Sequence, residues 1–379
     1  MSRWIKGVAY QHDKTKQLLL TIPKRAIAIV RHADIDSLAV EGLLNRKVKA
    51  VINFEPSMSG LYRHDHVQKL LDANIPVFDV KKSHLKNIAD LNGSRVEIEQ
   101  DSSLFLVSNQ TRSYVASLIP YNEQTVTKIN VCADHQFPQT FEAFFQNTIA
   151  YAQKELSFFT KKPIIPKMFQ HLAEKDIVIV ARSVGYEEDI RALRSWLKRK
   201  SLIKIAVDGA ADGLMRQRIK PDLIVGDMDS VSEKTLQQVS NRLVHQYLNG
   251  YAPGAERLQG LGLEGECFSF VGTSEDVAIH LAYWAGARHL YLIGCRSGFN
   301  EFLEKGRAGM GSSFLCRMQA GARVTDVKGI HRMVGTNETL PIWSFSIPLL
   351  VSLGMIVSHP RVELVAHLMW NWLKGGVVR

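Results

Sequence analysis

The chain has 379 residues, of which 46% are hydrophobic, and its formal net charge is +10 at pH 7. This length and composition predict two folded domains and exclude an intrinsically disordered protein. The positive charge is spread along the chain without the dense basic and aromatic stripe of nucleic-acid grooves, so we expect no nucleic-acid partner. The same charge suits a phosphorylated ligand or an anionic membrane face. Zinc-site spacing is absent among the four cysteines, which are Cys132, Cys267, Cys295 and Cys316.

Residues 1–137 are expected to form a small α/β domain. Three apolar runs alternate there with helix-like stretches, which predicts a β-α-β-α-β layer. The runs begin at Ala26, Lys49 and Ile75. Short β-prone segments follow, and residues 138–164 are expected to form a helix that begins at Pro138 and connects the two domains.

Residues 165–337 repeat the alternation of strands and helices. Continuous Val/Ile-rich runs separated by helices predict a parallel sheet with both faces covered, which makes the second domain α/β and Rossmann-like. The strand-like runs begin at Asp176, Leu202, Asp222, Cys267 and His289. Neither GxxxxGK[ST] nor GxGxxG occurs at a strand-turn-helix junction, which excludes a P-loop enzyme and argues against a classical dinucleotide fold.

Residues 338–379 contain a segment without charged residues, from Thr339 to Ser358. Its length matches the roughly 20 residues that a helix needs to cross a bilayer, so it predicts one transmembrane helix. A buried core helix is the alternative, because serines lower its hydropathy and Pro348 can kink it. An amphipathic helix with interfacial tryptophans is expected to follow. Because the N-terminus lacks an apolar signal segment, we expect the large part before the span to be cytoplasmic and held at the cell membrane.

Polar residues follow several strands of the second domain, where open α/β sheets bind their ligands. Asp227 and Asp229 are two residues apart, so both carboxylates can point the same way, and we expect them to be catalytic. Converging carboxylates repel one another unless a cation neutralises them. Together with Asp208 they are therefore expected to hold Mg²⁺, to which ATP or another nucleotide adds phosphate oxygens. The expected nucleotide-binding residues are Arg182, Asp208, Gly209, Gly226, Ser230, Thr273, Ser274, Asp276 and Arg307.

Structural explanations of the same motifs stay open. Asp229 and Ser230 can be turn and N-cap residues of the following helix. Thr273 with Asp276 matches a capping box at a helix start. Asp208, which precedes a glycine, can be a turn residue only. The coincidence of all three motifs at the strand ends of one domain favours a ligand site.

Two further segments stand out. The glycine-rich stretch after Arg307, with Gly309 and Gly311, is either an anion nest before a helix near Ser312 or a tight turn between helices. In the first domain, polar residues follow two strands, and they either line a second cleft that faces the second domain or are structural. These residues are His32, Asp34, Asp36, Asn53, Glu55, Ser57, Ser59 and Gly60.

The segments VDGAADGL, PDLIVGDMDS and GTSEDVAIHLA, in this order, resemble the catalytic domain of thiamin pyrophosphokinase. The resemblance implies an α/β fold that moves a pyrophosphoryl group from ATP to the thiamin hydroxyl with Mg²⁺. It implies that Asp227 and Asp229 hold the metal and the phosphates. It also implies that Asp208 and Gly209 lie beside the nucleotide, and that Asp276 is the acidic residue of the third motif.

Nearly the whole chain resembles SteA-type proteins, membrane-anchored relatives of that kinase linked to the bacterial cytokinetic ring, through segments such as KGVAYQHDKTKQLL, VINFEPSMSGLY and EFLEKGRAGMGSSFL. This resemblance implies a role in septation with a membrane-protein partner. Compared with typical pyrophosphokinases, Ala210 replaces a glycine of the DGG motif, and the membrane segment stands in place of the β-sandwich that completes the thiamin pocket. Three functions stay open: a nucleotide-binding protein of the division site, an active pyrophosphokinase acting on thiamin or another small alcohol, and a non-catalytic membrane scaffold. Each is compatible with a homodimer.

Overall fold

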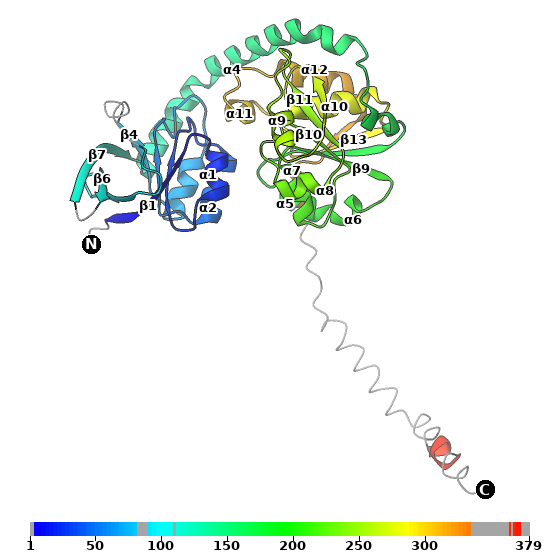
Figure 1. Cartoon of the computed structure of the whole chain (residues 1–379), viewed down its shortest axis with the longest axis horizontal. Helices are drawn as coiled ribbons and strands as arrows, with labels where there is room; N and C mark the ends of the chain where they lie inside the picture. The colour runs from blue at the N-terminus through cyan, green and yellow to red at the C-terminus, as the bar shows by residue number, and fades with distance from the viewer. Residues whose placement is uncertain (1–3, 82–89, 109–110, 335–363, 365–366, 373–379) are drawn as a thin grey trace. The chain divides into compact units, whose positions relative to one another are not determined.

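The computed structural model describes residues 4–81, 90–108, 111–334, 364 and 367–372. The chain divides into two compact units, Met1–Gly329 and Ile330–Arg379. The first unit contains a closed barrel and a seven-stranded sheet, and Figure 1 shows both with their helices. The fold is therefore α/β, as the sequence predicts.

A closed barrel forms the N-terminal part of the first unit. Strands β1 to β4 pair in parallel in chain order, whereas β7, β6 and β5 close the barrel through antiparallel pairs. Helices α1 (Thr15–Thr21), α2 (Ser37–Arg46) and α3 (His66–Asp72) pack against the parallel strands. The strands are β1 (Ile5–His12), β2 (Ile27–Val30), β3 (Ala50–Asn53), β4 (Val77–Val80), β5 (Arg95–Ile98), β6 (Ser103–Ser108) and β7 (Thr111–Pro120).

The parallel strands of the barrel are buried on both sides, which explains their continuous apolar runs. Ile27 and Ile29 pack with the other strands of the barrel, whereas Ala28 between them packs with the helices. The predicted layer is present as β2 to β4, but it is one part of the barrel and not a separate layer. Strand β1 was not predicted, because Lys6 and Gly7 interrupt its apolar pattern.

The second domain is built on a sheet with the strand order β12-β11-β10-β9-β8-β13-β14, and every neighbouring pair is parallel. This confirms the predicted parallel sheet. Strand order reverses between β8 and β13, and such switch points are where open α/β sheets bind ligands. The strands are β8 (Asp176–Val180), β9 (Leu202–Val207), β10 (Leu223–Gly226), β11 (Arg242–Gln246), β12 (Glu266–Ser269), β13 (His289–Ile293) and β14 (Val324–Asp326).

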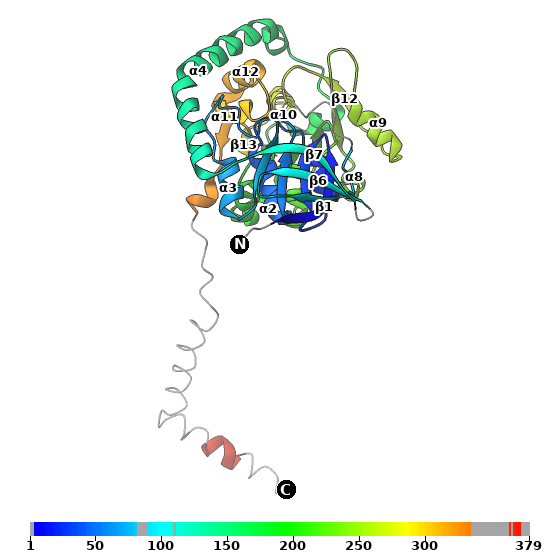
Figure 2. The same ribbon diagram turned by 90° about the vertical axis from the view of Figure 1, so that its left-hand side faces the viewer.

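Helices cover both faces of this sheet and enclose two apolar cores (Figures 1 and 2). One core includes α10 (Ser274–Trp284), α12 (Gly311–Ala320) and the end of α4 (Glu123–Thr160), and the 3₁₀ segment Lys167–Leu172 adds Phe169. The short helix α11 (Phe299–Leu303) precedes α12. The other core includes α5 (Tyr186–Ala192), α6 (Arg194–Leu197), α7 (Ala210–Arg216), α8 (Glu233–Gln238) and α9 (Pro253–Gly260).

Helix α4 is longer than the sequence predicts and curves along its length (Figures 1 and 2). It begins at Glu123, after Asn122, whose side chain accepts the N–H of Thr125 at 2.8 Å. Pro138 therefore lies inside the helix and does not start it. The prediction was wrong because proline is favourable in a first helical turn, and the capping Asn122 upstream was overlooked.

The predicted transmembrane segment, residues 339–358, lies outside the described residues. Among the residues that the structure does describe, no helix has both the length and the apolar character needed to cross a membrane. In the second unit, the exposed residues 367–372 are helical and include Trp370 and Trp372, which belong to the predicted amphipathic tail.

We expect Pro138→Ala to raise the free energy of unfolding by about 1–2 kcal/mol. Proline inside a helix costs roughly 3 kcal/mol relative to alanine, and its stiffening of the unfolded chain offsets up to about 1 kcal/mol of that cost. Chemical unfolding of the full chain, followed by circular dichroism, measures the change, with Gln139→Ala at the next exposed position as the control. A loss of stability in Pro138→Ala would show that the proline fits the bent helix without strain.

Candidate functional site

Three aspartates lie in contact at the carboxyl ends of the adjacent strands β9 and β10. Asp208 follows β9, and Asp227 and Asp229 follow β10. The N–H of Asp229 donates to Asp227 Oδ1 at 3.1 Å, and the N–H of Met228 donates to Asp208 Oδ1 at 3.3 Å. The structure thus brings together the three residues that the sequence predicts as metal ligands.

The proximity of the three carboxyls changes their acidity. Burial, and next the charges of Asp227 and Asp229, raise the pKa of Asp208 to about 8. Burial and the hydrogen bond with Asp229 also raise the pKa of Asp227. Burial acts on Asp229 in the same direction, but its hydrogen bonds with Asp227 and Lys16 hold its pKa below the ordinary value. Two of the three carboxyls therefore retain protons more strongly than isolated aspartates, as expected of buried acids that lie beside other acids.

The backbone at both strand ends adopts unusual conformations that allow this contact. Asp208 has φ 48°, Met228 has φ 60° and Gly226 has φ 148°. A Cβ at Gly226 would lie 1.8 Å from Asp208 Oδ1, so no side chain can replace the glycine while Asp208 stays in place. Gly226, which the sequence predicts to contact a nucleotide, makes room for the Asp208 carboxylate in this structure.

Lys16 from α1 of the barrel forms an ion pair with Asp229. The ammonium group is one of the causes of the low pKa of Asp229, and the charge of Lys14 adds to it. Sequence reasoning missed Lys16, because β1 was not predicted and the following segment HDKTKQ therefore had no place in the fold. A lysine in the first turn of a helix that follows a strand is the signal that could have found it.

Arg182 and Ser230 surround Gly209 after β9. The N–H of Gly209 donates to Ser230 Oγ at 3.1 Å. A Cβ at Gly209 would lie 2.6 Å from the Ser230 carbonyl oxygen and 2.8 Å from Arg182 Cζ. The structure places these three predicted residues together beside the aspartates. The N-cap interpretation of Ser230 is wrong, because Ser232 caps α8.

Arg257 of α9 holds the loop that carries the aspartates, and sequence reasoning missed it. Its guanidinium donates to the carbonyl of Met228, and at 2.9 Å to that of Val231. Gly254 lets α9 approach, because a Cβ there would lie 2.6 Å from the Asp227 carbonyl oxygen. A lone arginine in a polar helix gave no sequence signal for this positioning role.

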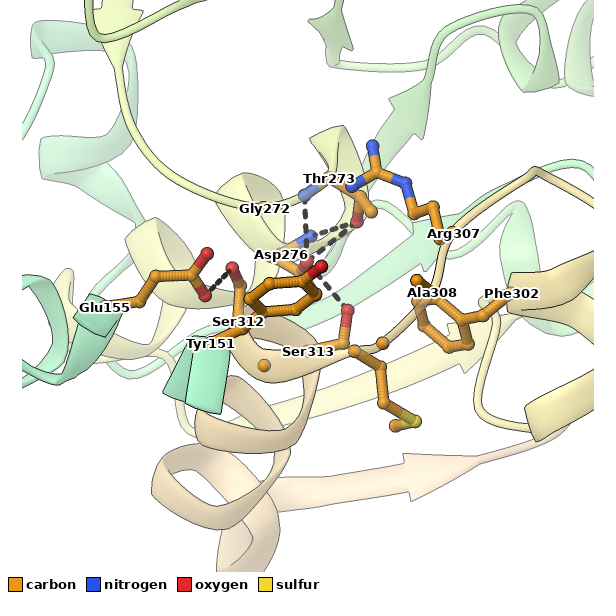
Figure 3. A pocket seen from close by; sticks show the side chains of 13 residues that line it. Tyr151, Glu155, Gly272, Thr273, Asp276, Phe302, Arg307, Ala308, Ser312 and Ser313 are labelled. Carbon is orange, nitrogen blue, oxygen red and sulfur yellow. Dashed lines mark hydrogen bonds between the residues drawn. The ribbon is translucent and has the colours of Figure 1, made fainter. Parts of the chain in front are cut away.

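The predicted residues Thr273, Asp276 and Arg307 line a cavity of about 280 Å³, shown in Figure 3, whose lining does not include the three aspartates. The capping box is confirmed: Asp276 Oδ2 accepts the N–H and the hydroxyl of Thr273, both at 2.9 Å. Ser313 Oγ of α12 donates to the same oxygen at 2.8 Å. Burial raises the pKa of Asp276. Its carboxyl therefore serves the packing of α10 and α12.

The remaining predicted residues near this cavity have modest roles. Ser274 Oγ lies 3.5 Å from His245 Nδ1 and does not line the cavity. Gly309 and Gly311 border it, and both also touch α4, since a Cβ at Gly311 would lie 2.6 Å from the backbone nitrogen of Ala152. The glycine-rich stretch is thus a close helix contact as well as one wall of the cavity.

Most polar residues after β2 and β3 stabilise the barrel itself. Asn53 Nδ2 donates to the carbonyl of His32 at 2.8 Å, and Ser59 Oγ donates to Asp34 at 2.8 Å. His32 and Asp36, however, line a cavity to which the second domain also contributes. This agrees in part with the predicted cleft.

The aspartate cluster fits Mg²⁺ by the chemistry of its donors, because hard cations take carboxylate oxygens. Within the described part of the chain, no group of three or more His, Cys, Asp or Glu side chains is arranged to hold a metal ion by itself. Mg²⁺ commonly uses one or two carboxylates and completes its shell with water and substrate phosphates. The cluster therefore suits an ion that arrives with a phosphorylated ligand.

Residues 194–248 match the family model described as thiamin pyrophosphokinase, catalytic domain. Asp208, Asp227 and Asp229 lie inside the matched segment, whereas Asp276 and Arg307 lie outside it. The second domain therefore contains a thiamin pyrophosphokinase-like catalytic domain. No curated protein matches the chain.

Two solved structures of thiamin pyrophosphokinases have some similarity to the chain. The enzyme of Bacillus subtilis is 18% identical, with a TM-score of 0.26. The enzyme of Geobacillus thermodenitrificans is 16% identical, with the same TM-score. Each comparison covers 40% of this chain and 59% or 58% of the other, so the chain spans less than two thirds of either enzyme. A 3-isopropylmalate dehydratase from Methanocaldococcus jannaschii matches at 12% identity and a TM-score of 0.23, over 37% of this chain and 99% of its own.

We expect the contribution of Asp208 to the free energy of unfolding, measured without divalent cations, to fall as the pH rises from about 4 to 8. In this window the unfolded chain loses the Asp208 proton, while the folded protein keeps it because its pKa is raised to about 8. The slope contributed by this group is at most about 1.4 kcal/mol per pH unit. Asp208→Asn, which tolerates the positive φ, should flatten the profile relative to the parent protein. Parallel profiles for both proteins would contradict the assignment.

Proposed function

We propose that the second domain binds ATP or a related phosphorylated ligand together with Mg²⁺ at the carboxyl ends of β9 and β10. The observation that carries this proposal is the contact among Asp208, Asp227 and Asp229, inside the segment that matches the catalytic-domain family. Acids held this close destabilise the site when they are ionised, and a divalent cation removes that cost. Phosphate oxygens would complete the shell of the cation.

Each nearby residue has a defined task in this proposal. Asp227 and Asp229 would hold Mg²⁺, with Asp208 supporting them through its hydrogen bond with Asp227. The ion would neutralise the negative charge of the phosphates. Arg182 would pair with a phosphate oxygen, and the missing side chain of Gly209 makes room for the Arg182 guanidinium beside the aspartates.

Pyrophosphoryl transfer from ATP to a small alcohol is the reaction that the family-model match favours. In such a transfer the protein contributes mainly by positioning the groups and stabilising charge, which is the task of the residues named above. Thiamin is the alcohol to test first, because the matched family is named for it.

Titration calorimetry of the full-length protein with ATP and Mg²⁺ tests the nucleotide proposal. We expect binding that requires Mg²⁺ and that Asp227→Asn and Asp229→Asn each weaken at least about tenfold, since each removes a metal ligand. Glu233→Gln, an exposed acid at the start of the neighbouring α8, is the matched control and should bind as the parent does. Lack of binding by the parent would overturn the proposal. Binding without release of AMP in the presence of thiamin would exclude thiamin as the second substrate and leave nucleotide binding in place.

We further propose that residues 339–358 anchor the chain in the cell membrane, with the large N-terminal part in the cytoplasm, and that the protein acts in bacterial septation with a membrane-protein partner. The support is the uncharged segment of membrane-spanning length and the resemblance to SteA-type proteins. In this proposal the nucleotide site would report a ligand to the division site.

Deletion of residues 339–379 should move the protein from the membrane fraction to the soluble fraction and abolish any septal localisation of a fluorescent fusion. The control is deletion of residues 374–379 alone, which keeps the uncharged segment and should leave the distribution unchanged. Equal distribution of the two truncated proteins would contradict the anchor, and the nucleotide proposal would be unaffected.

A further inference from the structure

A second cavity, of about 520 Å³, lies between the barrel and the sheet domain within the first unit. The barrel contributes α1, α2 and the residues after β2, and the sheet domain contributes the residues after β8, together with α5 and α7. The volume lies in the range of small-molecule sites, which is roughly 300–1,000 Å³.

Two side chains that line this cavity also contact the residues of the candidate site. Lys16 lines the cavity and pairs with Asp229. Arg182 lines it too, and its guanidinium lies against Gly209. A molecule in the cavity would therefore lie beside the carboxylates that are proposed to hold the nucleotide.

Part of the cavity wall carries charges of both signs. Glu187 pairs with Arg216, and Glu41 lies near enough to the acids of α5 that burial and their charges raise its pKa. Lys305 pairs with Asp36 at 2.6 Å. These contacts leave that part of the wall close to neutral.

The rest of the wall has an excess of positive charge. It carries four cations, Lys14, Lys16, Arg31 and Arg182, and one acid, Asp13. Arg31 lies 3.5 Å from the Glu55 carboxylate and 3.7 Å from that of Asp13, both beyond good hydrogen-bond length, and its side chain is 46% exposed. Neither Lys14 nor Arg182 has an ion pair within the described residues. Clefts lined by one sign of charge attract ligands of the opposite sign.

We infer that this cavity binds the anionic group, a phosphate or a carboxylate, of a second small-molecule ligand that meets the nucleotide at the aspartate cluster. The inference rests on the proposed function and specifies the class of the second ligand. An anionic alcohol suits the basic wall, whereas a cationic alcohol such as thiamin does not. The barrel is then part of the binding site, with Arg31 as the residue that determines specificity.

Calorimetric titration of the full-length protein with inorganic phosphate tests the inference, with the nucleotide site first saturated by Mg²⁺ and a non-hydrolysable ATP analogue. We expect Arg31→Gln to weaken phosphate binding by about 10- to 100-fold, the loss typical of one hydrogen bond to a charged group. Arg31→Glu should abolish binding, and Arg31→Lys should retain most of it. Arg199→Gln combined with Lys200→Gln, two exposed cations of the sheet domain outside the cavity, should bind phosphate as the parent does.

The outcomes separate this inference from the nucleotide proposal. Two results would overturn the inference that the cavity binds an anion: equal phosphate affinity in the parent and Arg31→Glu, or no phosphate binding at millimolar concentration. Neither result would affect the nucleotide proposal. Displacement of phosphate by thiamin would also overturn it. If the parent binds no nucleotide, the same phosphate titration is repeated without the analogue on two proteins, Asp227→Asn and the double variant Asp227→Asn with Arg31→Glu. Weaker phosphate binding by the double variant would still show that the cavity binds anions, and equal binding would contradict it.

Discussion

The repulsion among three aspartates held together by two neighbouring strands is the constraint on which the candidate site depends. The parallel sheet fixes where β9 and β10 end, so the acids after them cannot move apart without disturbing the core. Gly226 makes room for the Asp208 carboxylate, and Arg257 ties the following loop to α9. The close acids therefore lower the stability of the fold at this edge, and the proposed phosphate-bound cation would restore it.

Lys16 connects the barrel to the charges of the aspartate cluster. Its ammonium group is the cation nearest to Asp229, and it comes from a different domain than the aspartates. A divalent ion bound at Asp229 would compete with this contact, so ligand binding and the packing of α1 against the sheet domain are thermodynamically linked. The same linkage makes the cavity beside Lys16 sensitive to what the aspartates hold.

The sequence predicted the parts of this site that depend on local pattern. The spacing of Asp227 and Asp229 after an apolar run was enough to predict that both carboxylates lie at one edge of the sheet. Contacts between distant segments left no such pattern, and Lys16 and Arg257 were therefore missed. Helix starts were predicted wrongly where a residue type suits two positions. Pro138 suits a first helical turn but lies inside α4. Ser230 resembles an N-cap residue but accepts a hydrogen bond from the N–H of Gly209.

Asp276 shows why a motif does not by itself assign a role. The same side-chain oxygen accepts from Thr273 at the start of α10 and from Ser313 of α12, so the carboxyl joins two helices that cover one face of the sheet. A ligand that recruited this carboxylate would have to compete with those bonds, and burial adds to the cost of ionising it. The loop of Asp227 and Asp229 is instead held through its backbone by Arg257, and Asp229 contacts a helix through the partly exposed Lys16 of α1. Anchoring a loop by its carbonyls leaves its acids available for a ligand, which favours the ends of β9 and β10 as the place of the proposed chemistry.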